Sequence, residues 1–342
     1  MTLIYMILIL GIIVFIHEFG HFLFAKKAGI YVYEFSLGMG PRIFKFNRNN
    51  DETEYSLRLF PIGGFVRLAG EEIEADQNIP EDKRMQSKTW TEKFLTIIAG
   101  IMFNFILSIF VFFIVGLVNG CPQNKPYIDS VEDGINSNVV SVGDRIVAVN
   151  GKKVMFTDIL VLDVHMNSGK PLHLTIQNDS GKKDVVLNPI EVNNDGVVSY
   201  KYGIGLSDDS KTGLIASIGY AFSKFVSLFI QMIMVVFYLF IGKLGLSSMS
   251  GPVGIFNVVG ESAQAGFINL VYLVGFISLN VGFMNLLPIP ALDGGRVFFL
   301  IIEKIKGKSL DPKVENTINA VGFALLMLLM VVVTFNDIFK LL

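Results

Sequence analysis

The chain has 342 residues, of which 52% are hydrophobic and only 17% are charged. This composition is too apolar for an ordinary soluble protein and predicts several membrane-spanning segments. The formal net charge of −2, with no concentrated basic face, argues against binding to nucleic acid. Cys121 is the sole cysteine, which excludes an internal disulfide framework and a zinc site made of several thiolates.

The first predicted element is an apolar segment at residues 3–25. Its length is close to the roughly 20 residues that a helix needs to cross a bilayer. No Lys or Arg precedes it, and it is longer than a signal-peptide core, so we expect a membrane anchor that is not cleaved. Further apolar segments lie at 94–118, 266–289 and 316–335. We therefore predict an α-helical polytopic membrane protein with about four transmembrane helices.

Basic residues beside the span ends predict the orientation of the chain. Lys26 and Lys27 follow the first span, and four basic residues precede the second, namely Lys83, Arg84, Lys88 and Lys93. We expect this loop to be cytoplasmic. Basic residues also gather between 296 and 313, whereas the flanks of residues 119–212 carry few. We therefore place the middle of the chain on the outer side of the membrane.

Residues 214–241 are a fifth apolar candidate. Polar residues recur within them, several at helical spacing, at Ser217, Ser223, Lys224, Ser227 and Gln231. This pattern fits an amphipathic or packed helix as well as a span. A full crossing here would put the basic residues after position 296 on the wrong side of the membrane. We favour a peripheral or partly inserted helix.

The loop at residues 31–76 has strand-like content. Its segment "TEYSLRLFPIGGFVRLAGEE" alternates apolar and polar residues and then breaks at Pro61 and Gly63-Gly64, as in a hairpin. Because it lies between two predicted spans, we expect a membrane-associated β-hairpin that extends toward any site enclosed by those spans. An ordinary cytoplasmic hairpin fits the pattern equally well.

Residues 119–210 predict an inserted β-rich domain, flanked by membrane parts at 1–118 and 211–342. In "VGDRIVAVNGKKV" the alternation ends at Asn150-Gly151, a strong hairpin signal. This stretch resembles PDZ domains, which bind a peptide by adding it as a strand to a sheet edge. "YGIGL" at 202–206 is only a weak candidate for a carboxylate-binding loop. An unrelated small β domain is the alternative.

The motif HEFGH at residues 17–21 carries the chemistry. Residues four apart share one helix face, so His17 and His21 can bind one metal ion while Glu18 projects toward a water. Zinc makes such a water acidic, and the carboxylate can accept its proton and pass it to a leaving amine. Ionisable residues inside a predicted span are usually functional. The motif therefore predicts peptide hydrolysis within the membrane, toward its cytoplasmic side.

A catalytic zinc usually needs a third protein ligand, and Asp293 in "NLLPIPALDGGRVFF" is the best candidate. Pro288 and Pro290 interrupt the preceding span, and Gly294-Gly295 allows the backbone to approach closely. An ion pair at the helix end between Asp293 and Arg296 is the alternative.

Asn285 precedes this interruption on the membrane side. Its amide could hold a substrate carbonyl or the developing oxyanion. A hydrogen bond between packed helices is the alternative role.

These motifs in this order resemble the site-2 protease family of intramembrane zinc metalloproteases, specifically its RseP-type bacterial branch with a single PDZ domain. "SLGMGPRIF", "PIGGFVRLAGE" and "SGPVGI" also match segments of that branch, so the resemblance covers almost the whole chain. It implies one Zn2+ per chain held by His17, His21 and Asp293. It also implies Glu18 as the general base and Asn285 as a residue that contacts substrate.

The resemblance adds two expectations about substrate binding. The counterpart of "PIGGFVRL" is a membrane-reentrant hairpin that holds substrate as an added strand, which implicates Gly63, Gly64 and Phe65. "AGIMFNF" resembles an A-G-P-x-x-N-F pattern in which Ile101 replaces the proline and Asn104 is retained. We therefore include Asn104 among the substrate-binding candidates.

The resemblance further implies a multi-pass protein of the bacterial inner membrane that acts in regulated intramembrane proteolysis. Its substrates would be single-span membrane proteins, such as anti-sigma factors first cut by a site-1 protease, or remnant signal peptides. The PDZ-like domain would lie outside the cell membrane, as a size filter or docking site. A membrane-anchored PDZ adaptor with a dead site is disfavoured by the intact motifs. An ion- or proton-coupled transporter is the other alternative; it predicts an internal repeat, which the sequence does not show.

Overall fold

The computed structural model describes residues 1–342 except 50, 72–77, 195–196, 309–310 and 342. The chain forms two compact units. One comprises residues 1–111 and 246–342 and is called the helical unit, and the other comprises residues 112–245 and is called the β-rich unit.

The four predicted spans are long helices in the structure. They are α1 (Thr2–Lys27), α2 (Trp90–Asn119), α6 (Phe267–Leu286) and α8 (Pro312–Leu341). Among the described residues, five helices are long and apolar enough to cross a membrane, and the fifth is α4 (Leu214–Phe240). The chain is therefore a polytopic membrane protein with a β-rich part, whereas the number of crossings stays a prediction.

Two shorter helices complete the helical unit, α5 (Pro252–Gln264) and α7 (Asp293–Lys306). The start of α5 is fixed by Asp337 of α8, whose Oδ2 accepts hydrogen bonds of 2.8 Å from the backbone N–H groups of Gly251 and Gly254. A buried carboxylate at a helix N-terminus satisfies donors that the helix leaves unpaired. Short 3-10 turns lie at Glu81–Lys83, Met85–Ser87 and Leu246–Ser248.

The interruption predicted at Pro288 and Pro290 is confirmed, because α6 ends at Leu286 and α7 begins at Asp293. Gly294 lies so close to the carbonyl groups of Leu286 and Leu287 that a Cβ atom would overlap them, and Gly295 meets Ile289 in the same way. The glycine pair thus lets the first turn of α7 fold back onto the connecting loop, which fixes the position of Asp293.

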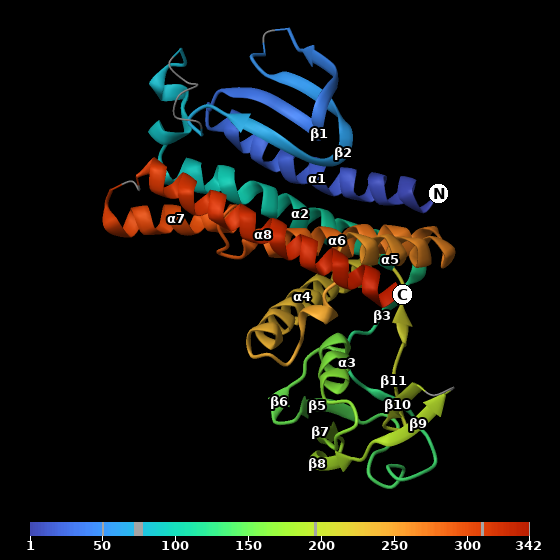
Figure 1. Ribbon diagram of the computed structural model, residues 1–342. Helices are drawn as coiled ribbons and strands as arrows, with labels where there is room; N and C mark the ends of the chain where they lie inside the picture. The colour runs from blue at the N-terminus through green and yellow to red at the C-terminus, as the bar shows by residue number, and fades with distance from the viewer. Residues whose placement is uncertain (50, 72–77, 195–196, 309–310, 342) are drawn as a thin grey trace. The chain divides into compact units, whose positions relative to one another are not determined.

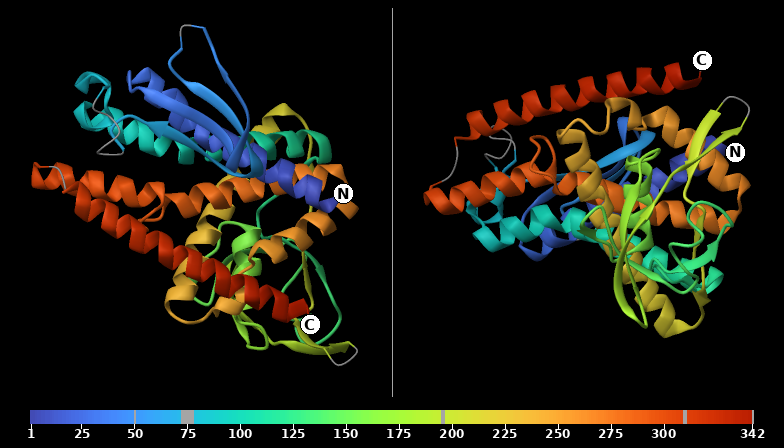
Figure 2. Two further views of the ribbon diagram at one scale, coloured as in Figure 1. Left: turned by 45° about the horizontal axis from the view of Figure 1, so that its top comes forward. Right: turned by 90° about the horizontal axis from the view of Figure 1, so that it is seen from below.

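An antiparallel hairpin is present, formed by the strands β1 (Val32–Asn47) and β2 (Glu54–Leu68). The predicted break at Pro61 and Gly63-Gly64 is wrong, because β2 runs through these residues, and the membrane association stays a prediction. Phe35 pairs with both Val66 and Tyr55, so each strand bends back on itself. The hairpin lies against α1, as Figures 1 and 2 show. Many of its apolar side chains are exposed, namely Met39, Ile43, Phe44, Phe46, Leu57, Leu59 and Phe60.

A charged network lies inside this hairpin. Arg58 Nη2 lies 2.8 Å and 3.1 Å from the two carboxylate oxygens of Glu34, and Ser56 donates a hydrogen bond to the same carboxylate. Burial alone would raise the pKa of Glu34, but the Ser56 and Arg58 hydrogen bonds outweigh it and hold the pKa below its usual range. The ionised pair therefore joins the two strands across the buried face of the sheet.

The β-rich unit contains a four-stranded sheet in the order β6-β5-β7-β8. Its strands are β5 (Arg145–Val149), β6 (Lys152–Lys153), β7 (Leu172–Asn178) and β8 (Gly181–Leu187), accompanied by α3 (Thr157–Met166). The smaller pairs are formed by β3 (Cys121–Pro122) with β12 (Ser210–Lys211), β4 (Ile128–Val131) with β11 (Ile204–Leu206), and β9 (Ile190–Asn194) with β10 (Val197–Lys201).

The hairpin turn predicted at Asn150-Gly151 is confirmed between β5 and β6. Both residues have positive φ, at 49° and 78° respectively. Such a two-residue turn follows the twist of the flanking strands. The sheet covers an apolar core that includes Ile146, Leu160 and Ile176. The likeness to a PDZ domain stays a prediction.

Within the β-rich unit, side-chain hydrogen bonds join helix α4 to α3. Asp158 accepts hydrogen bonds from Lys224 Nζ (2.8 Å) and Ser227 Oγ (2.7 Å), and Tyr238 donates one to Asp163 at 3.2 Å. Residues 224 and 238 lie about 21 Å apart along a helix. The opposite face exposes Ile215, Ile218, Phe222, Ile233 and Phe237. A crossing helix and a peripheral helix both fit this arrangement, so the peripheral placement stays a prediction.

We expect both ends of α4 to lie on one side of the membrane. Cysteines introduced at Lys211 and Lys243, each in a Cys121→Ser background, should both react with a membrane-impermeant maleimide added outside intact cells. A crossing helix would instead leave one of the two positions unreactive until the membrane is permeabilised, and that result would contradict the peripheral assignment.

Candidate metal centre

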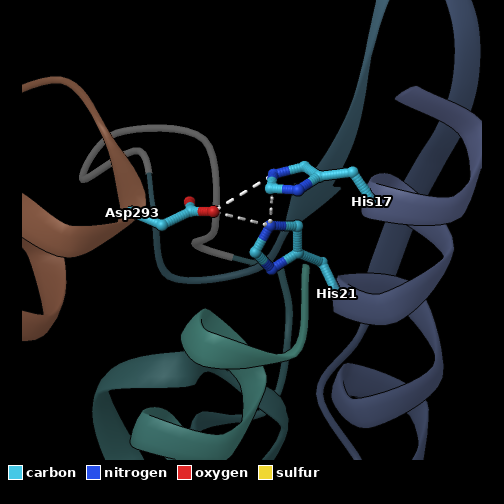
Figure 3. Close-up of side chains that lie close together, drawn as sticks. All are labelled: His17, His21 and Asp293. Carbon is cyan, nitrogen blue, oxygen red and sulfur yellow. Dashed lines mark hydrogen bonds and ion pairs between the residues drawn. The ribbon is translucent and has the colours of Figure 1, made fainter. Parts of the chain in front are cut away.

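The two histidines of α1 and Asp293 at the start of α7 point toward one another (Figure 3). Asp293 Oδ2 lies 3.1 Å from His17 Nε2 and 3.3 Å from His21 Nε2, and the two Nε2 atoms are 3.3 Å apart. The fold thus brings together the three residues predicted from the sequence as metal ligands.

The size of this triangle fits a zinc ion. Ligand atoms at about 2.0–2.1 Å from a tetrahedral zinc lie about 3.3–3.4 Å from one another. The observed separations of 3.1–3.3 Å match one face of such a tetrahedron. The three side chains would therefore occupy three positions and leave the fourth open, as in catalytic zinc sites.

The protonation of the site also favours a cation. His21 Nδ1 lies 2.9 Å from the backbone carbonyl oxygen of Thr96, so Nδ1 carries the hydrogen and Nε2 presents its lone pair. Asp293 Oδ2 is buried and has no hydrogen-bond donor among the described residues. A buried carboxylate oxygen in contact with two imidazole nitrogens, and with no other donor, favours a bound cation.

Asn104 of α2 supports His17 from behind. The side chain of Asn104 is fully buried, and its amide lies 3.2 Å from His17 Nδ1. If Nε2 of His17 faces a metal ion, Nδ1 carries the hydrogen and needs an acceptor. Asn104 Oδ1 has no hydrogen-bond partner among the described residues. Exchanging the amide oxygen and nitrogen positions places this oxygen beside His17 Nδ1 as the acceptor. The structure therefore places Asn104 behind His17, and its predicted contact with substrate stays a prediction.

Two glycines allow α1 and α2 to meet at the metal centre. A Cβ atom on Gly20 would lie 2.6 Å from the carbonyl oxygen of Ala99. A Cβ atom on Gly100 would overlap the imidazole of His21 and lie 2.8 Å from His17 Cε1. The imidazoles thus pack directly against glycine backbone. We did not predict this role for Gly20 and Gly100, although both glycines occur within the quoted motifs.

Glu18 lines the same cavity as the three ligands. This metal-site cavity has a volume of about 160 Å³, and its walls include Phe65 and Val66 of β2. A Cβ atom on Gly64 would lie 3.2 Å from Glu18 Cγ, so the strand passes directly beside the predicted base. Gly63 lies next to the side chain of Met39 instead.

Two further residues considered from the sequence, Arg296 and Asn285, do not belong to the three converging side chains. Arg296 forms an ion pair of 2.7 Å with Glu71, whereas Asp293 faces the histidines. Among the described residues, no ion pair joins Asp293 to Arg296, so the structure does not show the alternative pairing. Asn285 lies half-buried in the last turn of α6 and is not among the described residues that line the cavity. Its role in binding substrate stays a prediction.

Apolar helices of spanning length and a buried triad of two histidines and an aspartate beside a glutamate define a membrane metallopeptidase. Comparison with known proteins agrees. The sequence profile described as peptidase family M50 matches residues 5–329. The chain belongs to this family, the site-2 proteases, and is a zinc metalloprotease. This membership favours the protease over the transporter considered above.

Curated relatives cover nearly the full chain. A putative zinc metalloprotease of Clostridium acetobutylicum is 35% identical, over 97% of this chain and 96% of the relative. The zinc metalloprotease RasP of Geobacillus kaustophilus is 31% identical, over 99% and 98% respectively. The regulator of sigma-W protease RasP of Bacillus subtilis is 30% identical, over 99% of both chains.

Replacing Asn104 with leucine should weaken zinc binding about 10- to 100-fold, because His17 loses the acceptor that orients it. Zinc affinity can be measured by competition with a chromophoric chelator. At saturating zinc, the KM for a peptide substrate should stay near that of the wild type. A raised KM with unchanged zinc affinity would instead assign Asn104 to substrate binding.

Replacing Gly100 with alanine should also weaken zinc binding, by a comparable factor of about 10–100, because the added methyl group displaces the imidazole of His21. Gly11→Ala on α1 is the matched control, since nothing lies within 4 Å of a Cβ atom there. Equal zinc affinity of the two variants would show that the close helix approach is not needed for the metal centre.

Proposed function

We propose that this protein hydrolyses peptide bonds within the transmembrane segments of single-span membrane proteins. The observation that carries the proposal is the position of Glu18, between the His17–His21–Asp293 triangle and the backbone of β2. Substrates of this class would include anti-sigma-factor-like proteins and remnant signal peptides. The name of the Bacillus subtilis relative, a regulator of sigma-W protease, supports the first of these.

The chemistry assigned to the site uses one Zn2+ per chain, held by His17, His21 and Asp293. When bound, zinc would activate a water molecule and polarise the carbonyl group of the scissile bond. Glu18 accepts a proton in the cavity and delivers it to the amine that leaves. The apolar walls of the cavity, such as Val66 and Ile97, keep the number of competing waters low. Asn285 would contact the substrate backbone.

The hairpin would bind the substrate in an extended form. The carbonyl groups of a transmembrane helix are engaged in internal hydrogen bonds, so a scissile bond must first leave the helix. Pairing of the unwound segment with a strand edge would replace those hydrogen bonds. Gly63, Gly64 and Phe65 of β2 are the residues assigned to this contact. The position of Gly64 beside Glu18 supports the assignment.

We place the protein in the bacterial inner membrane, with the metal centre toward the cytoplasmic side and the PDZ-like domain outside. The basic residues Lys26 and Lys27 after α1 support this orientation. A site-1 protease would remove the outer part of a substrate first, and the PDZ-like domain would then admit or dock the shortened protein. Cleavage would release a cytoplasmic fragment.

Glu18→Gln should abolish cleavage of a tagged single-span substrate when the variant is expressed at the level of the wild type. The amide cannot accept the proton that hydrolysis requires, and loss of such a group typically costs about 10²–10⁴-fold in rate. Immunoblotting for the shorter cytoplasmic fragment measures the outcome. A variant that still produces this fragment at the rate of the wild type would refute the mechanism.

Zinc content serves as the control for this experiment. Purified wild type and Glu18→Gln should each contain about one zinc per chain by elemental mass spectrometry, whereas His17→Ala and Asp293→Ala should contain far less. Stoichiometric zinc in both ligand variants would remove the ligand assignment while leaving the role of Glu18 to be tested separately.

A further inference from the structure

Arg296 lies one helical turn after Asp293, on the same side of α7. Its Nη2 atom forms an ion pair of 2.7 Å with Glu71 Oε1. The other carboxylate oxygen of Glu71 accepts a hydrogen bond of 3.3 Å from the backbone N–H of Leu68, the last residue of β2. A continuous chain of contacts therefore runs from the end of the hairpin to the helix that carries the third metal ligand.

The same pair separates two cavities. The metal-site cavity and a second cavity of about 260 Å³, called here the outer cavity, share four lining residues, Glu71, Met85, Ile97 and Arg296. The outer cavity is also lined by charged and amide side chains, among them Lys93, Glu303 and Asn316. The two charges thus lie at the boundary between the reaction site and a polar compartment.

Helix α7 is attached along this side at three successive turns. Asp293 faces the histidines, Arg296 binds Glu71, and the backbone carbonyl of Leu300 accepts a hydrogen bond of 2.9 Å from Trp90 Nε1. Leu300 also packs in an apolar cluster with Leu68 and Ile97. Apolar packing holds the helix in place, but it is not directional. An ion pair with a hydrogen bond specifies the relative position of the two segments more closely.

The pair is too exposed to act mainly through stability. The side chain of Arg296 is 37% accessible and that of Glu71 is 21% accessible. Ion pairs with such exposure contribute little to the free energy of unfolding, because water screens the charges. A role in geometry therefore explains its place at the boundary better than a role in folding.

We propose that the Glu71–Arg296 ion pair positions the substrate for cleavage. It fixes the end of β2 against α7, and so sets which bond of a peptide paired with β2 lies between Glu18 and the metal ligands. This inference rests on the proposed function. Neither residue accepts a proton from the substrate or binds the metal, so both are positioning residues.

The test uses the full-length protein in lipid nanodiscs with a single-span substrate. Glu71→Gln removes one charge with almost no change in shape, and Arg296→Gln removes the other charge and shortens the side chain. Each should lower kcat about tenfold or more, since small misplacements of reacting groups are costly, while zinc content stays at that of the wild type. Mass spectrometry of the products should show cleavage spread to neighbouring bonds, which a merely structural role would not produce.

Exchange of the two charges supplies the decisive comparison. In Glu71→Arg with Arg296→Glu, the ion pair can form in reverse, and most of the lost kcat and the original cleavage bond should return. Glu52→Gln is the matched control, because it removes a hairpin ion pair to Lys26 of 2.7 Å that lies away from both cavities. This control should cleave at the bond and rate of the wild type.

Two results would overturn the inference: single variants that cut the same bond at the kcat of the wild type, or an exchange variant as impaired as the single variants together. Melting temperature and zinc content identify a single variant that misfolds. In that case, the kcat and the cleavage bond of the exchange variant test the inference. Failure of the proposed function is distinguishable, because Glu18→Gln would then cleave like the wild type whatever the effect of the ion pair.

Discussion

The structure depends on one electrostatic constraint, the convergence of His17 Nε2, His21 Nε2 and Asp293 Oδ2 within 3.1–3.3 Å of one another. Three lone pairs at this distance repel unless a cation lies among them. A cation held among these atoms would balance the carboxylate in a helical unit made largely of apolar segments. The features around it serve to hold these atoms at this separation.

Backbone shape provides most of that support. Gly20 and Gly100 let α1 and α2 meet where the imidazoles project, and Gly294-Gly295 folds the start of α7 onto the loop before it. Hydrogen bonds then orient each ring: His21 Nδ1 donates to the Thr96 carbonyl, and His17 Nδ1 lies against the Asn104 amide. The three candidate ligands are thus fixed by close helix contacts and by partners behind them, as metal centres generally require.

Polar contacts also organise the elements around the centre. Glu34 and Arg58 join the strands of the hairpin, Asp337 fixes the start of α5, and Glu71 joins the hairpin to α7. Contacts of this kind contribute little net stability, and their main effect is to fix how the joined segments meet. They explain how an apolar chain keeps one arrangement of its helices around the reaction site.

The sequence by itself determined the class of fold, the helical segments, the Asn150-Gly151 turn, and the identity of His17, His21 and Asp293, because periodicity and residue chemistry are local properties. Only the tertiary structure decided that Arg296 pairs with Glu71 and that Asn104 lies beside His17 Nδ1. It alone also showed that the missing side chain of Gly100 leaves room for the two imidazoles. These contacts join segments far apart in the chain. Their geometry depends on how the helices pack, which no local pattern encodes.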